Sequence, residues 1–109
     1  MRWFDALRRQ SEIAYVRRRG RRAGLATLSA FGLEADGARC RFGITVSKAT
    51  GGAVVRNRVR RRIRGALEAL TPLRPEPIRI LFVARPEAAA APYARLAADV
   101  ATALRRLGA

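Results

Sequence analysis

The chain has 109 residues, which fits one domain spanning 1–109 with a modest hydrophobic core. Its 23 basic and 8 acidic residues give a formal net charge of +15, so we expect a polyanionic partner. Nucleic acid is favoured over a membrane surface, because the basic stretches lack Leu-rich or large aromatic faces. The single cysteine, Cys40, and the absence of histidine exclude an internal disulfide and a zinc site.

The sequence also shows no pattern typical of a targeting or membrane segment. No window approaches the roughly eighteen consecutive apolar residues needed to span a bilayer. The segment Met1-Arg-Trp-Phe-Asp lacks the apolar centre of a signal peptide. We therefore expect a cytoplasmic protein.

The first twenty residues predict one short helix after an irregular start. Residues 1–10 show no clear period, and their apolar side chains either form one helical turn or pack against the domain. Ser11 is a suitable N-cap, residues 12–19 follow as a helix, and Gly20 ends it. Five arginines surround that end: Arg17, Arg18, Arg19, Arg21 and Arg22.

Two strands are predicted next. Residues 25–33 read as a strand, residues 34–38 (Glu-Ala-Asp-Gly-Ala) as a hairpin turn, and residues 39–47 as a second strand. The second strand alternates, and its two faces carry Phe42, Ile44 and Val46 on one side and Arg41, Gly43 and Thr45 on the other.

The second half of the chain predicts two helices and one strand. After a break at 49–52, a helix runs from about 53 to 70, and prolines at 72, 75 and 77 make the next connection extended. Residues 78–84 form a well-buried strand, and Pro92 suits the first turn of a last helix. Its apolar stripe contains Tyr93, Leu96, Ala97, Val100, Leu104 and Leu107. The order is α-β-β-α-β-α in one mixed sheet, with room for one further short strand.

The helix predicted at 53–70 separates an apolar face from a basic one. At about 100° per residue, a stripe of roughly 120° collects Val55, Val59, Ile63, Ala66, Leu67 and Leu70. The opposite face carries Asn57, Arg60, Arg61 and Arg64, with Arg58 and Arg62 beside it and Arg56 near the other edge of the stripe. Six arginines within nine residues therefore leave the core face intact.

This charge pattern is unfavourable for an isolated helix. Arg56–Arg60, Arg58–Arg62 and Arg60–Arg64 are like-charged at i,i+4, where opposite charges stabilise a helix. A cation in the first turn also opposes the helix macrodipole. A bound polyanion is the simplest compensation, and a merely solvated face is the alternative.

Residues for catalysis by the chain itself are lacking. Histidine, the commonest general base, is absent, and the eight acidic residues are scattered without metal-binding spacing. Ser47 and Lys48 form a lone dipeptide whose expected role is structural. We predict no catalytic residue and no metal site on the protein.

The segment Arg41-Phe-Gly-Ile-Thr-Val-Ser-Lys48, followed by Gly52-Ala-Val-Val-Arg-Asn-Arg-Val-Arg-Arg-Arg-Ile-Arg64, resembles the ribonuclease P protein family. That family combines an Arg-x-Gly…Val-Ser-Lys strand with an Arg-Asn-x-hydrophobic-Lys/Arg-Arg helix. Weaker similarity extends over nearly the whole chain. Ile13 and Arg17 depart from it, since aromatic residues are usual there.

The resemblance implies a two-layer α-β sandwich with a mixed sheet and a left-handed β-α-β crossover. It implies the protein subunit of a ribonucleoprotein that removes the 5′ leader from precursor tRNA by endonucleolytic cleavage. The helix with Arg56 to Arg64 would bind the catalytic RNA, which would hold most of the Mg²⁺ and pair 1:1 with the protein. A cleft between the sheet and the first helix would hold the leader. The residues assigned to that cleft are Tyr15, Arg17, Phe31, Arg41, Thr45, Lys48 and Arg85.

Two other classes of protein fit the bulk charge. A structural RNA-binding protein, either ribosomal or RNA-folding, would have a similar composition without a processing role. A DNA-packing protein would prefer duplex DNA at moderate salt. Only the Arg-Asn-Arg pattern favours the processing ribonucleoprotein over these two.

Overall fold

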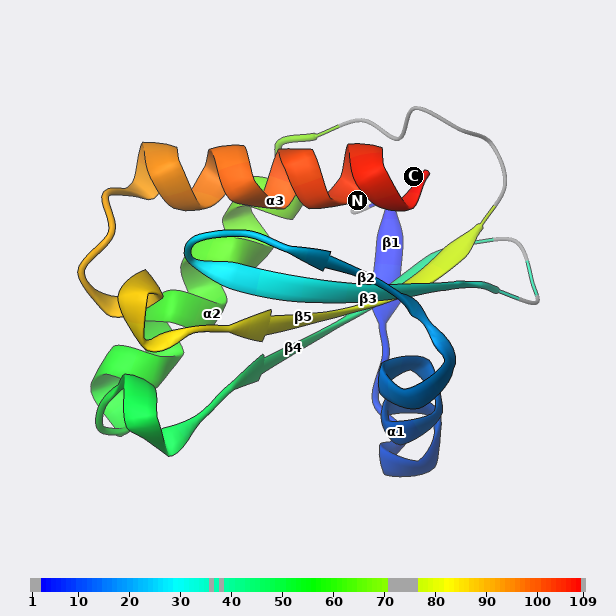
Figure 1. The fold of residues 1–109 in the computed structure, drawn as a ribbon, viewed down its shortest axis with the longest axis horizontal. Helices are drawn as coiled ribbons and strands as arrows, with labels where there is room; N and C mark the ends of the chain where they lie inside the picture. Colours follow the sequence, from blue (N-terminus) through cyan, green and yellow to red (C-terminus); the bar gives the residue numbers. More distant parts are fainter. Residues whose placement is uncertain (1–2, 36, 38, 71–76, 109) are drawn as a thin grey trace.

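A computed structural model describes residues 3–35, 37, 39–70 and 77–108 of the chain. The elements, drawn in Figure 1, are β1 (Phe4–Ala6), α1 (Gln10–Arg19), β2 (Arg21–Gly24), β3 (Leu28–Glu34), β4 (Cys40–Val46), the short 3-10 helix η1 (Lys48–Thr50), α2 (Ala53–Glu68), β5 (Ile78–Ala84), the 3-10 helix η2 (Pro86–Ala89) and α3 (Tyr93–Leu107). The extended connection predicted around Pro72 and Pro75 lies outside the described residues. Among the described helices, none has the length and apolar character needed to cross a bilayer.

One five-stranded sheet has the order β1-β4-β5-β3-β2. Strand β5 pairs in parallel with β4 and antiparallel with β3, so it separates the two strands that we predicted to form a hairpin. The hairpin prediction over 34–38 is therefore wrong as a pairing, although positions 36 and 38 themselves lie outside the described residues. The reason is burial. Ile80, Leu81 and Phe82 are at most 1% exposed, and a strand that is apolar on both faces belongs in the middle of a sheet.

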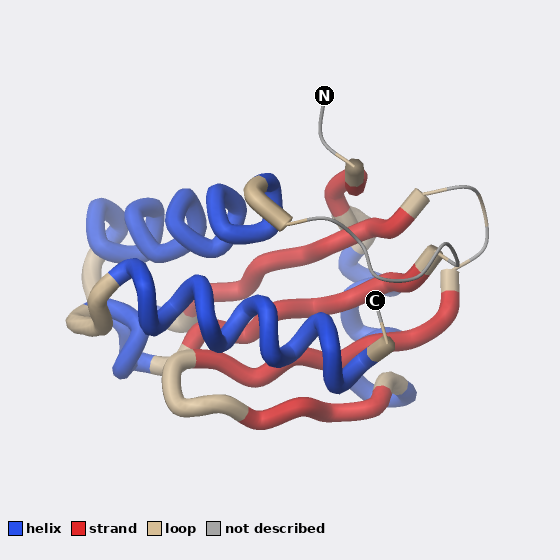
Figure 2. The backbone as a smooth tube through the Cα atoms, turned by 90° about the horizontal axis from the view of Figure 1, so that it is seen from above, coloured by secondary structure: helices blue, strands red, loops and turns tan. Residues whose placement is uncertain are grey.

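Helices cover the two faces of this sheet unequally. Figure 2 shows α2 and α3 side by side over one face, and Figure 1 shows α1 against the other. The larger core cluster lies under α2 and α3, and a smaller one, built on Leu7, Val16 and Leu81, lies under α1. The connection β4–α2–β5 joins neighbouring parallel strands through a left-handed crossover, as the resemblance implied and contrary to the usual hand (Figures 1 and 2).

Two short strands extend the predicted sheet where we had allowed for one. Phe4–Ala6 pairs in parallel with β4, and Trp3 beside it donates from Nε1 to the carbonyl of Leu67 at 2.9 Å. Arg21–Gly24 pairs antiparallel with β3, so part of the arginine cluster is a strand. Strands of three or four residues are too short to show a period. β3 begins at Leu28 instead of 25, because the Leu25 N–H bonds to the Leu28 carbonyl across a turn.

The predicted helices are present, but their ends differ. α1 begins at Gln10 with Arg9 as N-cap and no side-chain cap, so the assignment of Ser11 as N-cap is wrong. α2 ends at Glu68, two residues before the predicted end. In α2 the predicted stripe is confirmed, since Val59 and Ile63 are fully buried, and Val55 marks its half-buried edge.

The last helix buries four of the six side chains of its predicted apolar stripe, Leu96, Val100, Leu104 and Leu107, and Ala97 is half-buried. Pro92 is the residue before α3 and not part of its first turn, and Tyr93 is 44% exposed. Asp99 is instead buried, because its carboxylate accepts hydrogen bonds from the Thr27 N–H at 3.0 Å and the Thr27 hydroxyl at 2.6 Å. This pair ties α3 to the turn before β3.

Candidate nucleic-acid interface

The predicted RNA-binding side chains of α2 divide into two groups. Asn57, Arg61 and Arg64 are exposed, and Arg60 lies half-buried with its guanidinium donating to the Asn57 amide oxygen at 3.0 Å. These four form the outward group. In the described part of the chain no carboxylate forms an ion pair with them. The outward group therefore leaves its positive charge available to an external anion.

The other group is tied to the protein itself. Arg58 donates to the Ala89 carbonyl at 3.3 Å, and Arg62 donates to the Ala91 carbonyl at 3.0 Å. Both side chains thus hold the loop that leads into α3. Arg56 belongs to neither group: it is half-buried, and its Nε is buried without a hydrogen-bond partner among the described residues. The sequence placed all seven α2 side chains in one interface, whereas the structure gives Arg58 and Arg62 a structural contact as well.

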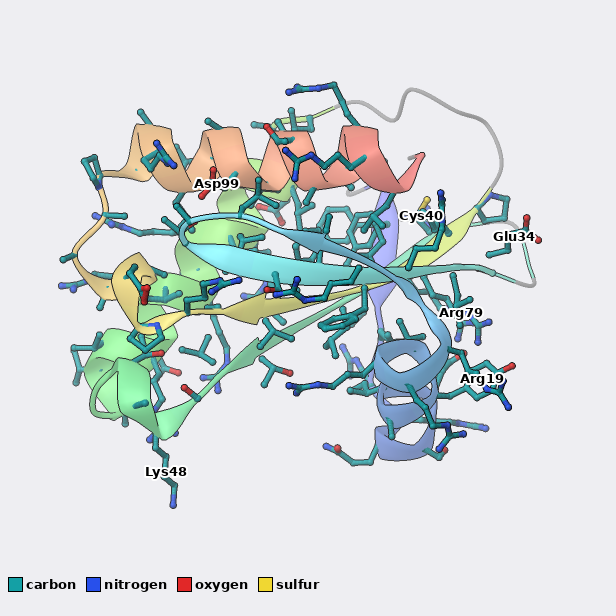
Figure 3. The ribbon with its side chains drawn as sticks, viewed as in Figure 1. Arg19, Glu34, Cys40, Lys48, Arg79 and Asp99 are labelled. Carbon is teal, nitrogen blue, oxygen red and sulfur yellow. The ribbon has the colours of Figure 1, made fainter. Side chains whose placement is uncertain are left out.

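On the other face of the sheet, alternate residues of three strands point toward the side of α1. Because successive strand residues face opposite ways, Phe31, Thr45 and Val83 share this face with the smaller core cluster. Figure 3 shows Lys48 projecting on the same side as α1, from the far end of the sheet. We call the surface that runs from α1 to Lys48 on this face of the sheet the α1-side strip. It is lined by Arg22, Ser29, Phe31, Thr45, Lys48 and Arg85.

The predicted leader-cleft residues do not meet in one pocket. Arg41 is the second residue of β4 and Thr45 lies near the end of that strand, so roughly 13 Å of strand separates them. Tyr15 and Arg41 line a shallow pocket together with Glu12 at the α1 end. Other predicted residues, such as Lys48 and Arg85, lie toward the opposite end of the sheet from this pocket. They make an elongated surface and not a single cavity.

Glu12 is a residue of this surface that the sequence analysis missed. Its carboxylate pairs with Arg41 at 2.8 Å and with Arg79 at 3.2 Å, and all three side chains are less than a third exposed. Arg79 lies next to α1 in Figure 3. Glu12 therefore neutralises part of the positive charge on this face of the sheet. The only signal in the sequence was an acid within a basic helix, which does not reveal partners on two distant strands.

Aromatic rings also lie on this face. The Arg17 guanidinium lies 5.8 Å from the centre of the Phe31 ring, and the Arg79 guanidinium lies 5.7 Å from the Tyr15 ring. Tyr15 is 44% exposed, whereas Phe31 is half-buried beneath Arg17. Tyr15 is thus the aromatic surface available on α1 despite the isoleucine at position 13.

Two further arginines converge on one hydroxyl. Arg22 on β2 and Arg85 after β5 both donate to Ser29 Oγ, at 3.1 and 3.2 Å. Arg85 Nε is buried and has no hydrogen-bond partner within the described residues. Arg22 and Ser29 were not among the predicted site residues, because pairing of β2 with β3 could not be read from the sequence. Arg22 and Arg85, held together by Ser29, place two positive charges in the middle of the α1-side strip.

Comparison with known proteins points to one family. The family model described as ribonuclease P matches residues 1–108. The chain is 42% identical to the ribonuclease P protein component of Streptomyces avermitilis over 112 positions, covering 94% of this chain and 91% of the relative. The corresponding protein of Acidothermus cellulolyticus is 42% identical over 105 positions, covering 93% and 86%.

Solved structures show the same fold. The RNase P protein from Thermotoga maritima superposes with a TM-score of 0.84 at 16% identity, covering 96% of this chain and 99% of that one. The RNase P protein of Staphylococcus aureus gives 0.84 at 18% identity, covering 95% and 97%. With a family match over nearly its full length and relatives above 40% identity, the chain belongs to the ribonuclease P protein family.

Proposed function

We propose that this chain is the non-catalytic subunit that holds two RNA segments for a catalytic RNA, one on each side of its sheet. The observation that carries this proposal is the separation of the two basic surfaces. The outward group of α2 and the α1-side strip lie on opposite faces, since α2 and α1 cover different sides (Figure 1). One continuous RNA helix would not reach both.

The outward group of α2 is the proposed contact with the catalytic RNA. Arginine forks match phosphate oxygens, and Asn57 already orients the Arg60 guanidinium at 3.0 Å. A rigid helix fixes these groups relative to one another, which suits a structured RNA. The like-charge repulsion along α2 is relieved when phosphates are bound.

The α1-side strip is the proposed binding surface for the single-stranded 5′ leader of precursor tRNA. Within the strip, the cationic groups of Arg85 and Lys48 would contact phosphates, and the exposed ring of Tyr15, on α1 beyond the strip, would offer a face for a base. Binding of this kind tolerates many sequences, because every base has a face that can stack. That property suits a leader whose sequence differs from one tRNA to another.

Hydrolysis is assigned to the RNA subunit and its magnesium ions, with one protein per RNA, in the cytoplasm. The described residues bring together no group of three Asp, Glu, Cys or His side chains suited to a metal ion. The protein's own residues neutralise phosphates and orient the leader, which lowers the magnesium concentration that the RNA needs.

Reconstitution tests this function. The full chain is combined with a bacterial ribonuclease P RNA, and precursor-tRNA cleavage is measured at low magnesium. We expect faster cleavage than with RNA alone. Lys48→Glu should reduce the preference for precursor over mature tRNA, whereas Arg60→Glu with Arg61→Glu should weaken assembly with the RNA. No gain over RNA alone, or copurification with ribosomal subunits in its place, would refute the proposal.

A further inference from the structure

A notch of about 360 Å³ lies beside the outward group, at the edge of the sheet. Three arginines form its rim: Arg8 after β1, and Arg60 and Arg64 on α2. Its floor is apolar: besides the small residues Ala6 and Gly43 it contains five large side chains, Phe4, Leu7, Phe42, Ile44 and Leu67. Four of these five are at most 4% exposed, and Ile44 is half-buried, so Ile44 offers the main accessible apolar surface.

The notch results from the short length of β1. β1 pairs only with the first three residues of β4, and the last contact on this edge is the Leu7 N–H donating to the Phe42 carbonyl at 3.0 Å. The chain then leaves the sheet toward α1. Beyond Phe42, β4 therefore has no neighbouring strand on this side, while α2 extends above the same edge.

The charge of the rim is not balanced by an ion pair in the described part of the chain. Among the described residues, none of the ion pairs involves Arg8, Arg60 or Arg64. Three guanidinium groups thus surround an apolar floor without a carboxylate. This combination suits a ligand that is anionic at one end and flat and weakly polar at the other.

We propose that the notch receives one unpaired nucleotide of the RNA that lies along α2. Its base and ribose would rest over Ile44, and its phosphates would be held by the three rim arginines. A paired nucleotide keeps its base inside the duplex and cannot reach the floor, so the notch selects a bulged or looped position. This inference rests on the proposed function and adds to it the recognition of a local RNA shape.

Two RNA hairpins test the proposal with the full chain. One carries a single bulged 2-aminopurine, and the other carries the same base paired with uridine. We expect the bulged hairpin to bind about fivefold more tightly, the factor that burying roughly 40 Å² of apolar surface supplies. The fluorescence of the bulged 2-aminopurine should change on binding, because its stacking changes.

Variants test whether the preference for the bulged hairpin depends on the notch. Ile44→Asn should bring the affinity ratio of the two hairpins close to one, while Val54→Asn, an apolar-to-polar change at a 79% exposed position of α2, should leave the ratio unchanged. Arg8→Ala acts at an exposed side chain outside α2 and should lower the ratio even if Ile44→Asn does not fold.

Two results would overturn the proposal. One is a ratio near one for the unmodified chain, and the other is a ratio that neither Ile44→Asn nor Arg8→Ala changes. If cleavage is still stimulated in reconstitution while the ratio is near one, only the notch is refuted. If stimulation is absent, the proposed function fails whatever the hairpins show.

Discussion

Replacing Glu12 by alanine should destabilise the protein and at the same time increase its affinity for single-stranded RNA. The carboxylate holds Arg41 and Arg79 at 2.8 and 3.2 Å, and alanine keeps the helix propensity of α1 high. Solvent partly screens the two ion pairs, because their side chains are partly exposed. We therefore assign about 1 kcal/mol of stability to each pair, between the contributions of fully exposed and fully buried ion pairs. The free energy of unfolding should fall by about 2 kcal/mol, and Tm by about 10 °C.

The gain in RNA binding follows from the same two contacts. Without Glu12, both guanidinium groups become available to phosphates on the α1 side of the sheet. Each new phosphate contact on a single strand steepens the dependence of log K on log salt by about 0.7, so the slope should steepen by up to about 1.4. Urea denaturation measures the loss of unfolding free energy, and fluorescence anisotropy of a short single-stranded RNA across a salt series measures the change in salt slope.

Glu87→Ala is the matched control. It removes the same charge from an exposed position on η2, so the unfolding free energy should change by at most about 0.5 kcal/mol. The RNA salt slope should also stay close to that of the unmodified chain. If Glu12→Ala and Glu87→Ala behave alike in both assays, Glu12 does not restrain the two arginines and the reasoning is refuted.

Three further predictions concern α2, the buried acid and one glycine. Reversing Arg60 and Arg61 to Glu should weaken RNA binding and reduce the salt slope by roughly one per lost duplex phosphate contact, measured by titration at several salt concentrations. Asp99→Ala should cost about 2–4 kcal/mol of unfolding free energy in urea, because two Thr27 donors lose their acceptor. Gly20→Ala should cost more than about 2 kcal/mol in the same assay, since its Cβ would lie 2.5 Å from a backbone oxygen.

Each of these has a control on the same chain. Arg105→Glu with Arg106→Glu reverses the same charge at the end of α3, and an equal change in salt slope would show that α2 has no special role. Thr27→Val removes only the hydroxyl and should cost less than Asp99→Ala. Gly52→Ala meets no atom within 4 Å and should change stability by about 1 kcal/mol or less, so equal losses for the two glycines would contradict the clash.

The sequence determined the features that depend on neighbouring residues. The buried and basic faces of α2 follow from a 3.6-residue period, and the apolar run at 78–84 predicted β5 with its observed bounds. The outward group of α2 therefore follows from the order of its residues alone. The resemblance around the Arg-Asn-Arg helix added the family and the hand of the crossover.

Tertiary structure alone decided which distant segments meet. The apolar run at 78–84 indicated a buried strand, but the pairing of β5 with both β3 and β4 depends on distant segments, and the sequence of one strand does not specify its partners. Glu12 pairs with Arg41 and Arg79 only because α1 packs across β4 and β5. Arg58 likewise donates to the carbonyl of Ala89, which is 31 residues away in the sequence. Side chains that one helical wheel places on a single face are thus divided between outward-facing positions and structural contacts, and the fold creates those contacts.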